Sequence, residues 1–239
     1  MARPREFDER SVLEAAVQCF WTRGYEATSV RDLAERMEMT GASLYNAFGD
    51  KRALYRRALD HYMAQGFDER VRRLEGELPP REAIEAFLCE IIARSLGDKQ
   101  RKGCMLVNAA LEAAPHDRQL RQVVADFQRK VESFFRRCVQ AGQREGTITS
   151  TRSADDLARL LLGVLMGIRV LARSRPERAL LEGVLRPVLA LLDVHTSELK
   201  RAKHDRALLL ADAERPQGHD VSRGSGPRLP HPSRRHQRG

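Results

Sequence analysis

The polar side chains best suited to specific recognition gather in one short stretch near the N-terminus, TGASLYN. Thr40 and Ser43 carry hydroxyls that can hydrogen-bond the edges of nucleic-acid bases, and Asn46 can pair with adenine or a phosphate. Ala42 can touch a thymine methyl group, and the Tyr45 hydroxyl can reach a phosphate. This set of side chains predicts a surface that reads double-stranded DNA.

Other polar residues flank this stretch. Thr28 and Ser29 precede a predicted helix, where their hydroxyls and the free backbone N–H groups could hold a phosphate. Each of them could equally be an ordinary helix cap. Lys51 begins a further predicted helix and could grip another phosphate, and Arg3 and Arg5 could enter the minor groove from an N-terminal arm.

These side chains depend on a frame of short helices. Apolar residues at helical spacing predict helices over 8–23, 29–37 and 42–48, and a longer one from Lys51 onward, capped by Asp50. A turn from Glu38 to Gly41 separates the second helix from the third. Leu33 can then meet Leu44, which predicts a helix-turn-helix whose second helix enters the major groove.

The rest of the chain also has helical periodicity and no strand signal, so the expected fold class is all-α. Pro79-Pro80 begins a helix that Gly97 ends, and further helices are expected over 104–114 and 117–143 and after Ser153 and Pro176. The last two helices are apolar around most of their surface. We expect a homodimer that buries their outer faces in a four-helix bundle, although a closed monomer could also bury them.

Charge divides the chain unevenly. The net charge is +9, but residues 1–60 contain ten Lys and Arg against ten Asp and Glu, whereas residues 195–239 contain ten against five. We therefore expect a DNA-binding domain over 1–60, a helical effector and dimerisation domain over 61–194, and a basic tail over 195–239 that is disordered. The tail could add sequence-independent affinity for DNA.

Residues 8–60 resemble the DNA-binding domain of the TetR family of bacterial transcription regulators. The matching residues are Ala15-Ala16, Phe20, Gly24-Tyr25, Thr28-Ser29-Val30, Asp32-Leu33-Ala34, Ser43-Leu44-Tyr45, Phe48, Lys51 and Leu54. The resemblance implies a homodimer of about nine helices per chain, a palindromic operator, repression as the default, and a small-molecule pocket in the C-terminal domain. Gly41 departs from the family, which often has a basic residue there, so the base preference is hard to infer.

The segment RKGCMLVNAALEAAPHD, residues 101–117, resembles that of NemR-like members of the family, which sense electrophiles or oxidants through a cysteine. Cys104 at a helix start beside Arg101 and Lys102 could be a reactive sensor thiol, or a small residue that packs a helix start. Asn108 could bind an effector or a neighbouring backbone group. Arg169 could neutralise an acidic ligand or lie at the dimer edge.

Several functions find no support in the sequence. No GxSxG, HExxH, GxxxxGK[ST] or GxGxxG pattern occurs, so an enzyme is not expected, and neither a metal nor a cofactor is indicated. No apolar stretch suggests a signal peptide or a membrane span, and four widely spaced cysteines suit a reducing cytoplasm. The remaining alternative is an architectural DNA protein that binds through its basic tail.

Overall fold

The structure is a computed structural model that describes residues 8–194, and every regular element in that range is a helix. The all-α fold class is confirmed. The elements are α1 (Glu9–Arg23), α2 (Val30–Arg36), α3 (Gly41–Phe48), α4 (Lys51–Met63), the π-helix η1 (Ala64–Asp68), α5 (Glu69–Glu77), α6 (Pro80–Gly97), α7 (Met105–Glu112), α8 (Arg118–Glu145), α9 (Ala154–Ser174) and α10 (Arg178–Ala190). The arm residues Arg3 and Arg5 and the tail 195–239 lie outside the described residues.

Helix starts follow the capping signals of the sequence. The side chains of Asp8, Asp50, Asp117 and Ser153 each accept a hydrogen bond from a backbone N–H in the first turn of α1, α4, α8 and α9, and Pro80 is the first residue of α6. These contacts satisfy backbone donors that the helix itself leaves without partners. Local sequence therefore decides where most of these helices begin.

Gly24 ends α1 in a backbone conformation that favours glycine. Its φ of +84° lies in a region that L side chains rarely adopt, and a Cβ at this position would stand 2.8 Å from Glu112 Oε2. The backbone conformation therefore favours glycine, whereas the flexible end of the Glu112 side chain could move aside for a Cβ. The close approach of α7 brings the end of α1 against the C-terminal half of the chain.

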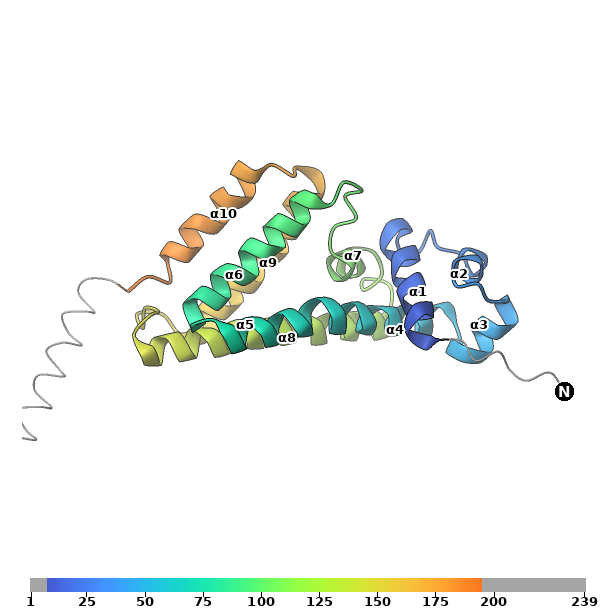
Figure 1. Cartoon of the computed structure of the whole chain (residues 1–239), viewed down its shortest axis with the longest axis horizontal. Helices are drawn as coiled ribbons and strands as arrows, with labels where there is room; N and C mark the ends of the chain where they lie inside the picture. Colours follow the sequence, from blue (N-terminus) through green and yellow to red (C-terminus); the bar gives the residue numbers. More distant parts are fainter. Residues whose placement is uncertain (1–7, 195–239) are drawn as a thin grey trace, which may run out of the picture. The chain divides into compact units, whose positions relative to one another are not determined.

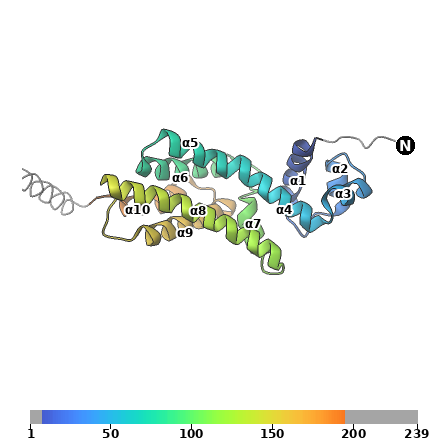
Figure 2. The same ribbon diagram turned by 90° about the horizontal axis from the view of Figure 1, so that it is seen from below.

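One continuous helical segment passes through α4, η1 and α5, from Lys51 to Glu77 (Figures 1 and 2). It runs beside α8, to which it is tied by ion pairs between Lys130 and Asp68 and between Arg137 and Glu75. Counted as one helix, this segment brings the number within residues 8–194 to nine, as the family resemblance implies. In a π-helix the backbone hydrogen bonds span five residues instead of four, and such segments are frequent at functional sites.

Two groups of aromatic rings mark the core. Phe20 and Tyr55 join α1 to α4, with ring centroids 4.8 Å apart. Phe87 of α6 meets Phe134 of α8 at 5.0 Å, and Phe67 of η1 packs edge-on against Phe87 at 6.0 Å. Burying each of these side chains contributes roughly 1.5–3 kcal/mol. They hold the N-terminal helices on one end of α4 and the remaining helices around α8 and α9.

The expected boundary between residues 60 and 61 falls inside α4, and the described residues belong to one compact unit. The physical reason is that Leu59 and Met63, on either side of that boundary, are both buried in the same helix. The DNA-reading and C-terminal halves therefore share α4 instead of a linker. In the described part of the chain, no helix is long and apolar enough to span a membrane.

Candidate DNA interface and effector cavity

The surface of α3 carries the residues expected to read bases. Leu44 and Phe48 are buried against the other N-terminal helices, and the opposite side of α3 exposes Ala42, Ser43 and Asn46. Tyr45 is half exposed, at 50%, which is unusual for a large ring in a folded protein. An exposed strip of small and polar side chains beside one free aromatic ring suits insertion into the major groove.

Thr40 caps α3, so this helix begins one residue earlier than predicted. The Thr40 hydroxyl accepts a hydrogen bond from the backbone N–H of Ser43 at 3.1 Å, and the two hydroxyls lie 2.9 Å apart. Gly41 is consequently the first residue of the helix and not the last residue of the turn. No atom lies within 4 Å of the position that a Cβ on Gly41 would take, so the glycine leaves an open space at the tip of the recognition helix.

The turn before α3 is strained at one residue. Glu38 has a φ of +54°, a left-handed conformation that side chains other than glycine and asparagine adopt at a cost of roughly 1–2 kcal/mol. Met37 and Leu44 are buried on either side of the turn. Their packing holds α2 and α3 in the helix-turn-helix arrangement that the sequence predicts.

Thr28 and Ser29, both expected at phosphates, differ in exposure: Thr28 is buried, whereas Ser29 is exposed. Thr28 is only 1% exposed, and its hydroxyl donates to the Gly24 carbonyl oxygen at 2.6 Å. The Ser29 hydroxyl donates to the Asp32 carboxylate at 2.6 Å and accepts from the Asp32 backbone N–H at 3.1 Å. Burial makes the Thr28 hydroxyl unavailable to a phosphate, so that expected contact is wrong. The contact expected of the exposed Ser29 stays a prediction, beside the ion pair of Asp32 with Arg23.

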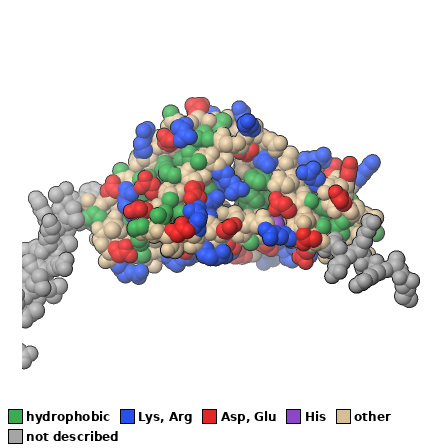
Figure 3. Space-filling model, in the orientation of Figure 1, with side chains coloured by type: hydrophobic (Ala, Val, Ile, Leu, Met, Phe, Trp, Pro, Cys, Tyr) green, Lys and Arg blue, Asp and Glu red, His purple; other side chains and the backbone are tan. Residues whose placement is uncertain are grey.

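Lys51 is anchored by contacts within the protein. It is the first residue of α4, its Nζ donates to the Glu26 carbonyl oxygen at 3.4 Å, and it stands 4.5 Å from the centre of the Tyr25 ring. These contacts fix the ammonium group beside the loop between α1 and α2. Lysine and arginine side chains are otherwise interspersed with acidic ones on the visible face (Figure 3), so this end of the molecule is not a uniformly basic surface.

Cys104 and Arg169, two of the residues expected at an effector, line one cavity. The cavity measures about 40 Å³ and lies under η1, with Phe67, Phe87 and Met166 among its walls. The Tyr62 hydroxyl donates to Cys104 Sγ across 3.9 Å. Burial raises the pKa of Tyr62, so its hydroxyl stays protonated and remains a donor.

Cys19, Cys104 and Cys138 are buried, and Cys89 is exposed. Burial raises the pKa of Cys19, and it raises the pKa of Cys138 to about 12; burial and the carboxylates of Glu85 and Glu182 raise that of Cys89. Thiolates are disfavoured at those three positions. Cys104 caps α7 and borders a cavity that Arg94 and Arg169 also line.

Asn108 does not join this cavity. Its amide nitrogen donates to the Lys102 carbonyl oxygen at 2.9 Å, and its amide oxygen accepts from Arg173 at 3.0 Å. Both ends of a buried amide are thus satisfied by the protein, and Asn108 ties the loop before α7 to α9. The sequence left two partners open for the Asn108 amide, an effector or a neighbouring backbone group, and the structure supports the backbone group.

Sequence reasoning missed Trp21, which links the two halves of the molecule. Its indole N–H donates to the Gly103 carbonyl oxygen at 3.0 Å, and its ring meets Tyr62 at 5.1 Å. The signal was present in the sequence, since this is the only tryptophan in 239 residues. It lay outside the predicted reading surface, so nothing in its spacing pointed to a partner 82 residues away.

The fold and the exposed face of α3 define a helix-turn-helix DNA-binding regulator of transcription. Residues 12–58 match the family model of the bacterial regulatory proteins, tetR family, and residues 80–187 match that of the tetracyclin repressor-like C-terminal domain. The solved structure of the TetR family transcriptional regulator CifR, a cysteine mutant complexed with 26-bp operator DNA, is 35% identical, with a TM-score of 0.71. The match covers 79% of this chain and 98% of that one. The protein belongs to the TetR family.

Two further relatives agree with this assignment. The HTH-type transcriptional repressor ComR of Escherichia coli (strain K12) is 28% identical over 173 residues, which cover 72% of this chain and 82% of ComR. The reduced form of E. coli NemR has a TM-score of 0.68 at 21% identity, over 77% of this chain and 97% of that one. At that identity the NemR likeness shows the fold alone. The family is one of regulators and not of enzymes.

Proposed function

We propose that this protein is a repressor that binds a palindromic operator as a homodimer and leaves the DNA when a small molecule occupies the C-terminal half. The exposed face of α3 carries the proposal. The DNA-contacting residues are proposed to be Ser29, Thr40, Gly41, Ala42, Ser43, Tyr45, Asn46 and Lys51, with Arg3 and Arg5 added from the arm. A regulator that binds chromosomal DNA works in the cytoplasm.

The outer faces of α9 and α10 support the dimer. Leu160 and Val170, 39% and 46% exposed, lie on the same side of α9 as Gly163 and Gly167, and neither glycine has an atom within 4 Å of a potential Cβ. Large apolar side chains beside open glycines form a surface onto which another helix can pack closely. Gly183 and the exposed Leu191 give α10 the same character. A two-fold pair of these faces would complete a four-helix bundle.

Selection of bound DNA from a random pool tests the proposal, because it works without a known target sequence. A palindromic site bound by two chains, with the complex mass measured in solution, is the expected result. Recovery of unrelated sequences would instead favour an architectural protein that binds through its basic tail. A non-palindromic site bound by one chain would contradict the homodimer.

A second candidate is an electrophile sensor, favoured by the position of Cys104 at the cavity. An electrophile such as N-ethylmaleimide should release the wild-type protein from its selected DNA and should leave Cys104→Ser bound. Cys89→Ser is the matched control, because Cys89 is the exposed cysteine among the described residues. Release of Cys104→Ser by the reagent would exclude Cys104 as the sensor, and loss of response in Cys89→Ser would transfer the role to Cys89.

A further inference from the structure

A second cavity, of about 190 Å³, lies between α1, the end of α6 with the loop after it, and α9. Its walls hold five cationic side chains, from Arg94, Arg101, Lys102, Arg169 and Arg173, and a single carboxylate, from Asp98. The cavity opens to solvent, and Arg94, Arg101 and Arg173 are exposed, while Lys102 and Arg169 are half-buried. Like charges that gather around one hollow repel each other, and a bound anion relieves that repulsion. The composition of this cavity therefore points to an anion.

Little of this positive charge is compensated by the protein. Asp98 accepts a hydrogen bond from the Gly103 backbone N–H at 3.0 Å, and Arg173 reaches Glu112 only at 3.8 Å. Arg169 donates to the neutral hydroxyl of Ser95 at 3.2 Å. Within residues 8–194, no carboxylate lies within ion-pair distance of Arg94, Arg101 or Arg169. These guanidinium groups keep most of their donors available to a ligand.

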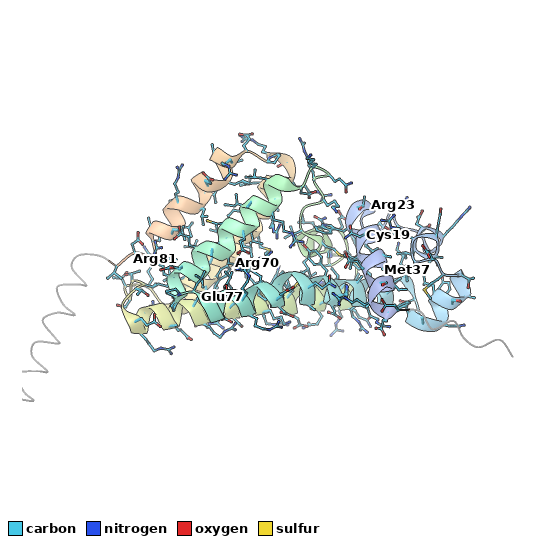
Figure 4. The ribbon with its side chains drawn as sticks, in the orientation of Figure 1. Cys19, Arg23, Met37, Arg70, Glu77 and Arg81 are labelled. Carbon is cyan, nitrogen blue, oxygen red and sulfur yellow. The ribbon has the colours of Figure 1, made fainter. Side chains whose placement is uncertain are left out.

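The cationic cavity adjoins the smaller one that contains Cys104. Arg94 and Arg169 line both, so they stand between a polar space and an apolar one. Burial lowers the pKa of Arg70, and the charges of Arg94 and Arg169 lower it further, which shows that three guanidinium groups lie close together here. Arg70, on the side of α5 that faces α6 (Figure 4), is held by Glu90 at 3.0 Å. Among the described residues, Arg94 and Arg169 have no such counter-ion.

We propose that the effector of this protein is a small organic monoanion whose carboxylate binds Arg94 and Arg169. Guanidinium groups match a carboxylate with paired, charge-assisted hydrogen bonds. A cavity of about 150 Å³ can hold a benzene ring, so 190 Å³ suits one ring or a short alkyl chain with its acid group. The apolar part lies against Trp21 and Ala172, which also line the cavity.

The same cavity has a physical route to the DNA-reading end. Trp21 belongs to α1, which packs on α4, and it forms part of the cavity wall. Lys102 stands 4.4 Å from the centre of the Trp21 ring, and the next residue, Gly103, accepts the indole hydrogen bond. An anion that attracts Lys102 competes with its contact to Trp21 and displaces the loop on which α1 rests. This regulatory step rests on the proposed function, whereas anion binding itself does not.

The single tryptophan makes the binding step directly measurable. Titration of the full-length protein with sodium benzoate, followed by Trp21 fluorescence, should give a saturable change, as should titration with sodium hexanoate. Benzamide has nearly the same shape without the charge and should bind roughly tenfold more weakly or worse. Equal responses to benzoate and benzamide, or no saturable response to either acid, would overturn the proposal.

Matched variants locate the site. Arg94→Gln and Arg169→Gln should each weaken benzoate binding roughly tenfold and leave benzamide unchanged. Arg144→Gln removes the same charge from an exposed position on α8 and should leave the affinities for benzoate and for benzamide unchanged. Arg169→Lys keeps the charge and should retain part of the affinity for benzoate. Thermal unfolding followed by circular dichroism verifies that each variant folds. Wild-type affinity in both glutamine variants would contradict the site.

Release of the selected operator DNA, followed by fluorescence anisotropy, separates the two proposals. Benzoate binding with DNA release supports both. Saturable benzoate binding without release supports the anion site and contradicts its role as the effector site. Specific DNA binding with no response of Trp21 to either acid supports the DNA-binding function and overturns the anion site.

Discussion

The indole N–H of Trp21 donates a 3.0 Å hydrogen bond to the carbonyl oxygen of Gly103, and this bond joins α1 to the loop that precedes α7. The two residues are 82 positions apart in the chain. Gly103 has a φ of +72°, and Arg101 beside it has a φ of +52°, so this loop holds two left-handed residues. The contact therefore connects the DNA-reading helices to a segment that is conformationally restricted.

Replacement of Trp21 by phenylalanine tests this connection. Trp21→Phe keeps a ring against Tyr62 but removes the donor, so unfolding should cost about 1 kcal/mol less in urea titrations. Amide hydrogen exchange in residues 98–104 should become faster because the loop loses its anchor. Tyr62→Phe is the control, since it removes the hydroxyl near Cys104 and keeps the indole bond. Unchanged exchange in Trp21→Phe would show that the loop does not depend on this contact.

Tyr45 offers the sharpest test of the DNA interface. The ring is half exposed, so Tyr45→Ala should change the free energy of unfolding by less than about 0.5 kcal/mol. Affinity for the selected DNA should nevertheless fall roughly tenfold or more, because the variant loses the ring and the hydroxyl that are proposed to contact the DNA phosphates. Leu111→Ala removes another exposed apolar side chain, on α7, and should leave DNA binding unchanged. Wild-type affinity in Tyr45→Ala would exclude this ring from the interface.

Gly41 allows a positive charge to be added at the tip of α3. Gly41→Arg should fold normally, because a Cβ there meets no atom within 4 Å. Each new phosphate contact should increase the slope of log affinity against log salt concentration by about one. Gly76→Arg adds the same charge on α5, also at a position open within 4 Å, and should leave the slope unchanged. Equal slopes in the two variants would show that residue 41 does not face the phosphates.

Asp32 predicts a particular dependence of stability on pH. Hydrogen bonds from the Ser29 hydroxyl and backbone N–H, and then from Arg23, lower the pKa of Asp32 to about 2. The unfolded chain has a pKa of about 3.9 for this group, so the native state binds the proton less tightly. The stabilisation is present above about pH 5 and is lost as the pH falls toward 2. Urea midpoints of wild type and Asp32→Asn should therefore differ at about pH 7, approach each other below about pH 4, and converge only at about pH 2 or lower; a constant difference would exclude this linkage.

Much of the architecture was decided locally. Asp8, Asp50 and Ser153 cap their helices through hydrogen bonds to residues within three positions, so their role could be inferred before the fold was considered. Leu33 and Leu44 also revealed the helix-turn-helix, because their spacing determines which sides of two short helices can meet. Short-range hydrogen bonds and periodicity are properties of the sequence itself.

The environments of individual side chains were decided by tertiary structure. Thr28 and Asn108 are buried with internal partners, and the polar residue types alone did not distinguish this from exposure to a phosphate or an effector. The cationic cavity draws residues from α1, α6 and α9, whose separation along the chain hides their proximity. Helix caps and helix faces follow from neighbours in the sequence. Burial and the clustering of like charges depend instead on packing between helices that are distant in the chain. Only the folded chain therefore brings Trp21, Arg94 and Arg169 together.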